Sequence, residues 1–398
     1  MDFIGIGAFV ICFALTLITM IRRREIDLII LTAALLRFGM VAFYSFTGDS
    51  DPDGYGFRAL MFSEMSIPEL FANFQTGAYF YSWLISFFYR AFGESMLMVR
   101  SLNGLLSMLA IVIVYDLIRD LYNKEVARKA MLFMAAFPAL IRFSAPFASR
   151  ETLYLFLEMV ALRNLFSYYK GKGIQFLILG VISTGFACIV HTASFMFFVL
   201  ILLIFMNNSA GDRGIQLLIG AVGACFVCAG IWFMTSRGIG TEKLYLNSGG
   251  LNLDKLNWIS ESSADGRAAY LKGFTFSNPV LTVLFLPVRT AFFLYAPFIW
   301  MIRAAADIFG FVDAALYLLV SYYAVKNIQA ILANEQRSRE QLFVLFIGVM
   351  LLCMLAMFAI GTSNYGTALR HRAKLILFFV VLCGPLLDWP IHIRGEKY

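Results

Sequence analysis

Charged residues are scarce in this sequence. They make up 14% of its 398 residues, against 61% hydrophobic residues, and the mean hydropathy is +0.78. Apolar runs of about 20 residues, long enough to cross a bilayer, recur along the chain. No stretch of ordinary globular composition is left between them, which excludes a sizeable soluble domain. The composition therefore predicts an all-α polytopic membrane protein, with residues 1–398 forming a single integral membrane domain.

Other expected features are also missing. The net charge is +7, yet no basic stripe with interleaved aromatic residues is present, so nucleic acid is not an expected partner. The six cysteines stand singly except Cys225 and Cys228, which favours neither a disulfide framework nor a zinc site. The first apolar run has no small-residue cleavage site and precedes three arginines at 22–24, so we expect it to be retained as a span.

The apolar runs divide the chain into thirteen candidate spans. They cover residues 3–21, 26–46, 78–93, 101–117, 128–145, 150–168, 174–190, 192–206, 214–234, 279–302, 307–325, 341–361 and 372–390. Basic residues mark the stretches expected in the cytoplasm, at 22–24, 119–129, 163–172, 326–339 and 394–397.

Two long loops are then expected outside, at 47–77 and 235–278. Between each outside loop and the next cytoplasmic stretch the chain must cross the membrane an odd number of times. Two apolar runs lie there instead, once between residues 77 and 119 and once between residues 278 and 326. We expect 78–93 and 279–302 to be interfacial or re-entrant, because the first is short and the second contains Pro287 and Pro297. About 11 to 13 transmembrane helices result, unless one basic loop breaks the charge rule.

The loop at 47–58 concentrates acid in a chain that has little. Asp49, Asp51 and Asp53 lie between two apolar runs, interspersed with turn-forming glycine and proline. Loops held by a rigid scaffold often carry chemistry, so we interpret 47–77 as an external catalytic loop. The alternative is a solvated connector whose acids keep it out of the bilayer.

A second group of charges opens the run at 150–168. Arg150 and Glu151 stand at its start, where a charge is costly unless it faces a cavity or has a partner, on the order of 2.5 to 3.5 kcal/mol on insertion scales. Their predicted position on the same side as the aspartates suggests function, although both could also reach the interface by snorkelling.

A third group, Arg370, His371 and Arg372, is also predicted to be external, where the charge rule does not favour it. Guanidinium groups fit phosphate oxygens, so these residues, with Arg150 and Arg289, are candidate ligands of a donor phosphate. The alternative is a misassigned cytoplasmic helix end. His191 is predicted near the same face, where a lone histidine is more often a packing residue than a catalyst.

Carboxylates and cations on one face suit the transfer of a group from a phosphate to a hydroxyl. A carboxylate accepts the hydroxyl proton, and the arginines stabilise charge on the departing phosphate. A lipid-linked substrate would explain why such chemistry occupies a membrane scaffold.

The order of several short motifs resembles the GT-C superfamily of polyprenyl-phosphate-sugar-dependent glycosyltransferases. The motifs are Asp51-x-x-x-Tyr55-x-x-x-Ala59, Arg100-x-x-Asn103, Phe137-Pro138, Glu151 opening a span, and Arg370-x-Arg372. The resemblance covers most of the first 170 residues and the region 361–390.

The resemblance implies a GT-C-like fold and a polyprenyl-linked sugar donor bound from the outer leaflet. It also implies a catalytic base in the first external loop and inversion at the anomeric carbon. Asp51 matches the loop acid, but Pro52 stands where the family often has a second acid, so Asp49 and Asp53 stay alternatives and Glu151 a further catalytic candidate.

The expected partners are a polyprenyl-phosphate or polyprenyl-diphosphate sugar donor, a glycan or lipid-linked acceptor, and membrane lipids. Tyr55, Trp258 and His191 are candidate acceptor or sugar contacts, and 235–278 is the candidate acceptor or lid loop. The sequence does not decide whether a metal is required, and a divalent cation could bridge Asp49, Asp51 and a diphosphate. The expected location is the bacterial inner membrane, with the site facing the periplasm.

Two other functions fit parts of the pattern. A polymerase of polysaccharide repeat units would use the arginines and histidines rather than the loop acids. A transporter or flippase of lipid-linked substrates would use the intramembrane charges and the proline-broken helix, but no inverted repeat is visible.

Overall fold

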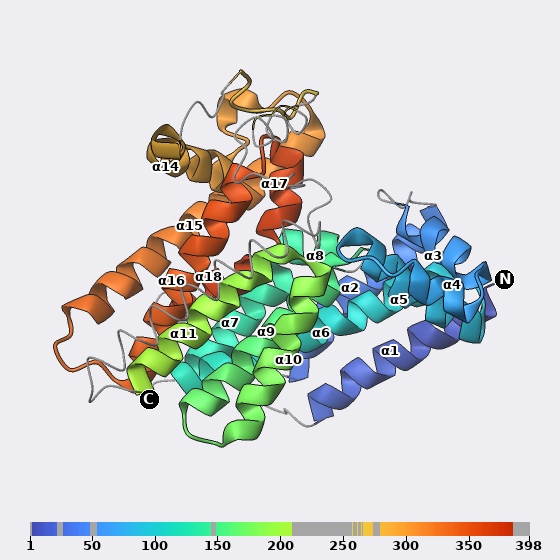
Figure 1. The fold of residues 1–398 in the computed structure, drawn as a ribbon, viewed down its shortest axis with the longest axis horizontal. Coiled ribbons are helices and arrows are strands. Elements are labelled where there is room, and N and C mark those ends of the chain that lie inside the picture. Colours follow the sequence, from blue (N-terminus) through green and yellow to red (C-terminus); the bar gives the residue numbers. More distant parts are fainter. Residues whose placement is uncertain are drawn as a thin grey trace, which may run out of the picture.

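The computed structural model describes residues 2–21, 27–47, 54–144, 149–208, 257, 261, 264, 266–273 and 279–384. Within these ranges the chain forms 16 α-helices and no strand, so the predicted all-α class is confirmed. Figure 1 shows the longer helices running side by side as a bundle.

Short connections join consecutive α-helices except α11 and α14, which are separated by residues 209–278. They are α1 (Phe3–Ile21), α2 (Asp27–Thr47), α3 (Tyr55–Glu64), α4 (Ile67–Ala72), α5 (Ala78–Phe92), α6 (Met96–Leu121), α7 (Lys124–Ala136), α8 (Pro138–Ser144), α9 (Glu151–Tyr169), α10 (Ile174–Val190), α11 (Phe197–Asn208), α14 (Pro279–Tyr295), α15 (Ala305–Ala333), α16 (Arg339–Ile360), α17 (Tyr365–Arg372) and α18 (Ile376–Leu382). Short 3-10 turns at Thr192–Met196 and Ile299–Met301 precede α11 and α15.

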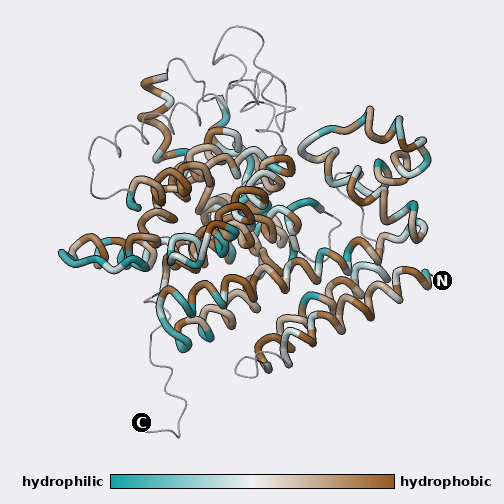
Figure 2. The backbone as a smooth tube through the Cα atoms, turned by 60° about the horizontal axis from the view of Figure 1, so that its bottom comes forward, coloured by the Kyte–Doolittle hydropathy of each residue, from teal (hydrophilic) through white to brown (hydrophobic). Residues whose placement is uncertain are grey.

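Four helical stretches are long and apolar enough to cross a membrane, and four shorter apolar stretches accompany them. The long ones are Leu28–Ser45, Met96–Leu121, Ala305–Ala333 and Arg339–Ile360, and the shorter ones are Phe3–Thr19, Ile174–Val190, Thr192–Asn208 and Val280–Tyr295. In Figure 2 the long helices are largely brown, with the hydrophilic residues gathered near their ends. This pattern is that of a polytopic membrane protein.

Contacts between helix termini define two ends of the bundle. At the first, which we call the α17 end, Asp2 before α1 accepts a hydrogen bond from Ser95 before α6. At the opposite end, Lys170 after α9 pairs with Glu340 in the first turn of α16. We call this the basic end, because Lys124, Lys170, Lys172, Arg337 and Arg339 lie in or beside its turns.

Helix α5 begins and ends at the α17 end. The N–H of Gly77, just before it, donates to the carbonyl of Ile189 near the end of α10, at 2.8 Å. Ser95, just after it, lies beside Asp2, with 2.6 Å between the hydroxyl and a carboxylate oxygen. Helix α5 therefore returns without crossing, as the charge pattern predicts for the run 78–93.

Helix α14 lies at the same end, as Figure 1 shows. Arg289 in its middle donates to the carbonyl groups of Ala359 and Ile360 where α16 finishes. This is the position expected for the proline-broken run 279–302. The interval 47–77, expected as a loop, contains α3 and α4, and Ser66 with Glu69 forms a capping box that starts α4. The division into a membrane domain and two functional loops stays a prediction.

The predicted span 128–145 is two helices, because Pro138 interrupts it. Proline has no N–H to pair with the carbonyl of Met134 one turn earlier. The guanidinium of Arg37 in α2 takes the place of the missing N–H. Arg37 is fully buried and donates to the carbonyls of Met134 and Ala135, each at 3.1 Å, and to the hydroxyl of Ser107 at 2.9 Å. A buried arginine therefore closes the end of α7.

Candidate functional site

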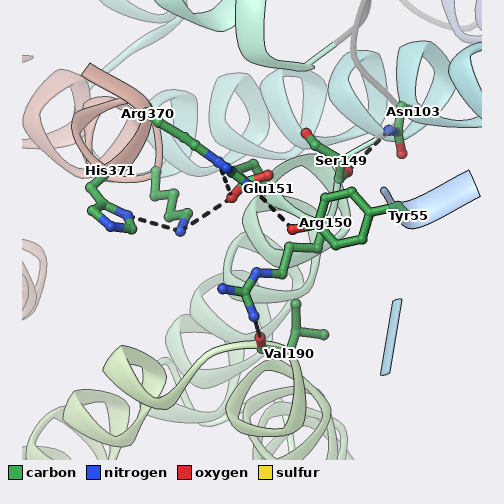
Figure 3. A network of polar contacts seen from close by, with 9 residues as sticks. Tyr55, Asn103, Ser149, Arg150, Glu151, Val190, Arg370 and His371 are labelled. Carbon is green, nitrogen blue, oxygen red and sulfur yellow. Dashed lines mark hydrogen bonds and ion pairs between the residues drawn. The ribbon is translucent and has the colours of Figure 1, made fainter. Parts of the chain in front are cut away.

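The centre of the candidate site is Glu151, the first residue of α9. Its side chain is 5% exposed. Oε1 accepts a hydrogen bond from Nε of Arg370 at 2.8 Å and lies 3.5 Å from Nζ of Lys374 (Figure 3). A carboxylate in the first helical turn is also favoured by the partial positive charge of the helix N-terminus. One buried carboxylate thus brings together two cations from the C-terminal part of the chain.

Arg370 extends this group toward the first external segment. Its Nη2 donates to the hydroxyl of Tyr55, the first residue of α3, at 3.0 Å. The Tyr55 ring packs edge-on against Tyr81, with 5.3 Å between ring centroids, and Arg58 lies over its other side at 5.4 Å. Arg370 therefore links α17 to α9 and to the helix that directly follows the aspartate loop.

A polar chain positions the start of α9. The hydroxyl of Tyr81 donates to Asn103 at 2.9 Å, and the amide of Asn103 donates to the carbonyl of Ser149 at 3.0 Å. Ser149 lies two residues before Glu151, so α5 and α6 together fix the point at which α9 begins. Asn103 belongs to a motif that the sequence indicated, whereas its contact with Ser149 had no sequence signal.

Arg150 approaches the same place from the other side. Its Nη1 donates to the carbonyl of Val190, the last residue of α10, at 3.1 Å (Figure 3). Gly77 has φ of 73°, and a Cβ there would come 3.2 Å from this guanidinium. A left-handed glycine is thus needed both for the turn and for the approach of Arg150.

His371 and His191 complete the group. Nδ1 of His371 lies 3.1 Å from Nζ of Lys374, and its ring centroid lies 5.9 Å from that of His191. Burial, followed by the charge of Lys374, holds the pKa of both imidazoles well below the ordinary histidine value. Both rings are therefore neutral at pH 7.

The charges at this site do not balance among the described residues. Arg150, Arg370 and Lys374 supply three positive charges, and Glu151 supplies one negative charge. Burying a surplus of cations is costly unless an anion accompanies them. The arrangement is thus suited to an anionic ligand such as a phosphate.

Two of the predicted phosphate ligands lie elsewhere. Arg372 is fully buried, pairs with Asp313 at 3.0 Å, and donates to the carbonyls of Leu294 and Ala296 after α14. Arg289 is fully buried and donates to carbonyls at the end of α16 and to the hydroxyl of Ser363. Their contacts are with the protein, and neither is grouped with Glu151.

The structure brings together Tyr55, Arg150, Glu151, His191, Arg370 and His371 of the predicted site residues. Asp49, Asp51, Asp53 and Trp258 lie outside the described residues, so their roles stay predictions. No group of three His, Cys, Asp or Glu side chains within the described ranges is placed to hold a metal ion. Lys374 is the residue that the candidate set missed, because a lysine at the start of an apolar run has no distinctive sequence signal.

Residues 77–232 match a family model described as dolichyl-phosphate-mannose-protein mannosyltransferase. The GT-C resemblance is confirmed. The matched segment includes Arg150, Glu151 and His191, whereas the aspartate loop and α17 lie outside it. Among curated proteins, none matches the chain. The family is one of GT-C membrane glycosyltransferases, which agrees with the apolar helical bundle.

Proposed function

We propose that the protein transfers a sugar or glycan from a polyprenyl-(di)phosphate carrier to an acceptor hydroxyl, in the assembly of a cell-surface polysaccharide or glycoconjugate. The observation that supports this most is the surplus of cations around Glu151 among the described residues, at a helix end next to the segment that follows the aspartate loop. The matched family is described by a dolichyl-phosphate-linked sugar, a donor of the same chemical class.

In this proposal Arg370, Arg150 and Lys374 hold the donor phosphate. They stabilise the charge that grows on it as the bond between the anomeric carbon and the phosphate oxygen breaks. Glu151 is a positioning residue, since its Oε1 is paired with both Arg370 and Lys374. An oxygen that faces two cations is a poor proton acceptor. Tyr55 fixes the far side of the Arg370 guanidinium.

Asp51 is the proposed base. It takes the proton of the attacking hydroxyl while the new glycosidic bond forms on the face opposite the departing phosphate, which inverts the anomeric carbon. Asp51 precedes Tyr55 by four residues in sequence, and Tyr55 contacts the cation group. Asp49 and Asp53 are the alternative bases.

The first experiment compares Asp51→Asn with Asp49→Asn and Asp53→Asn, each assayed for transfer from a polyprenyl-phosphate sugar. We expect Asp51→Asn to lower the rate by at least about 100-fold, because the amide removes the base with little change of shape. The other two variants are the matched controls. Activity near that of the unsubstituted protein in Asp51→Asn would move the base to whichever neighbour loses activity.

The second experiment tests the proposed orientation, with the α17 end outside. In a cysteine-free protein, Thr367→Cys at the α17 end and Gln336→Cys at the basic end are both at exposed positions. A membrane-impermeant thiol reagent applied to intact cells should label position 367 and leave position 336 unlabelled. The opposite pattern would place the site in the cytoplasm and exclude a periplasmic reaction.

A repeat-unit polymerase uses the same class of donor, and the adjoining rings of His191 and His371 favour it as the second candidate. It predicts that Asp51→Asn keeps activity while Arg370→Ala loses it, and that the product is a ladder of repeat units. Single-sugar transfer predicts one product and dependence on both residues.

A further inference from the structure

The imidazole of His371 has a defined contact on one nitrogen only. Nδ1 lies 3.1 Å from Nζ of Lys374. A lysine ammonium has three donors and no acceptor, so it can only donate in this contact. Nδ1 must then carry a lone pair, and the proton of the neutral ring belongs on Nε2.

Lys374 is held rigidly as the donor. Its side chain is 1% exposed, and its Nζ lies 3.5 Å from Oε1 of Glu151. The ammonium also lies over the rings of Tyr154 and Phe358, at 5.5 and 5.7 Å from their centroids. Burial has the largest effect and lowers the pKa of Lys374 to about 7, whereas the carboxylate of Glu151 and the aromatic faces favour the charged form, so the lysine is an ammonium below neutral pH.

The charged surroundings also disfavour an imidazolium at His371. Lys374 and Arg370 face it from its own segment, Arg150 and Glu151 from the start of α9, and the neutral ring of His191 from the end of α10. Burial and the three cations, opposed by Glu151 alone, keep the pKa of His371 well below its ordinary value.

The other nitrogen is available. Among the described residues no hydrogen-bond partner of Nε2 occurs, and the His371 side chain keeps part of its surface exposed. A neutral N–H that points away from Lys374 is a donor without a protein acceptor. It lies in the group of residues whose surplus charge favours an anion.

We propose that Lys374 fixes His371 as a neutral imidazole protonated on Nε2, and that this N–H donates a hydrogen bond to an oxygen of the phosphate-linked substrate. His371 is then neither a base nor a cation in the reaction. The substrate contact rests on the proposed function, whereas the protonation state does not.

The protonation state is tested by ¹⁵N NMR of histidine side chains in the purified protein reconstituted in liposomes. The chain has three histidines, so His191→Asn and His392→Asn assign the signal of His371. We expect a neutral ring protonated on Nε2 from about pH 7, the pKa of Lys374, down to pH 5.5. In Lys374→Met the pKa of the ring should rise toward the ordinary value, since one cation is gone while burial and the two arginines remain, and the proton should no longer be confined to Nε2. A cationic ring or a proton on Nδ1 at neutral pH in the unsubstituted protein would overturn the proposal.

The substrate contact is tested with a matched pair of amides. The amide nitrogen of His371→Gln reaches the place of Nε2, whereas that of His371→Asn reaches only the place of Nδ1. We expect Gln to keep activity within about tenfold and Asn to lose about 100-fold, the range of one hydrogen bond to a charged group. Equal losses in the two variants, or no loss in either, would overturn the contact between His371 and the substrate. The protonation state of His371 is decided by the NMR measurement alone. If none of Asp49→Asn, Asp51→Asn and Asp53→Asn changed the rate, the proposed function would fail and not the protonation state.

Discussion

Two sets of buried or half-buried cations occupy this bundle, and their negative partners differ. Arg37, Arg289 and Arg372 donate to carbonyl groups at the ends of α7, α16 and α14. Arg370 and Lys374 instead converge on one carboxylate, that of Glu151. The first set meets the partial negative charge of helix ends, and Arg372 also has one carboxylate to itself, that of Asp313. The second set shares one carboxylate and leaves positive charge unbalanced among the described residues.

This difference separates structural from functional arginines in a membrane protein. A helix broken by proline, or ended within the bundle, has carbonyls with no intrahelical partner, and an arginine satisfies several at once. Such a residue is buried and charged, yet it contacts nothing outside the protein. Burial alone is thus a poor sign of a site, and the identity of the counter-group is the better one.

The largest expected effect on stability is at Arg372. Arg372→Met leaves Asp313 buried without its partner, so the free energy of unfolding should fall by about 3 to 5 kcal/mol. Thermal unfolding in detergent measures this. The double variant Arg372→Met with Asp313→Leu should recover part of the loss, because the unpaired charge is then gone. If Arg372→Met instead lost donor binding at unchanged stability, Arg372 would belong with the second set.

A smaller loss is expected for Arg37→Met. The carbonyls of Met134 and Ala135 lose their donor, which should cost about 2 kcal/mol at about 1 kcal/mol for each unsatisfied group. The catalytic rate per folded molecule should stay within about twofold of the unsubstituted protein. A selective loss of activity in a protein of normal stability would contradict the capping role.

Arg370→Lys should show the reverse pattern. Its best control is Arg163→Lys, since Arg163 also pairs with a carboxylate. The distance between nitrogen and oxygen is 2.7 Å for Arg163 and 2.8 Å for Arg370, and the side chains are 24% and 25% exposed. Both variants should change stability by less than about 1 kcal/mol. Donor binding should weaken by about 10 to 100-fold in Arg370→Lys alone, because lysine cannot reproduce the guanidinium fork. Equal binding in the two variants would break the comparison.

The smallest effect is expected at the basic end. Lys170 and Glu340 form a partly exposed pair between the α9–α10 turn and α16. Lys170→Gln should lower stability by about 0.5 kcal/mol or less, and the difference should vanish in high salt. Unfolding curves at low and high ionic strength check this, and a loss that persists in salt would mean that the pair is more than a surface contact.

The sequence was sufficient for the architecture. Apolar runs at 3–21 and 174–190 coincide with α1 and α10, because hydrophobic length is a local property. The number of apolar runs between successive loops also indicated that the run at α5 does not cross the membrane. The two helices within 128–145 show the limit of this prediction. The sequence contains Pro138, but Arg37, which donates to the carbonyls left free before the proline, lies about 100 residues away in sequence.

The site was only partly predictable for the same reason. Residue types and the predicted face indicated Glu151, Arg150, Arg370 and His371, but nothing in the sequence separated Arg370 from Arg372. They lie two residues apart on α17, so they point about 200° apart around the helix. One reaches Glu151 and the other Asp313. That choice depends on tertiary packing.

The ion pair between Glu151 and Arg370 joins residues 219 positions apart. During synthesis, α9 is inserted long before α17 has left the ribosome, so Glu151 enters the membrane without its two cations. A carboxylate in that position needs a temporary partner or a proton until the C-terminal helices arrive. The order of translation thus makes completion of the charge cluster a late event in assembly, and chains arrested before α17 are inserted but lack half of the site.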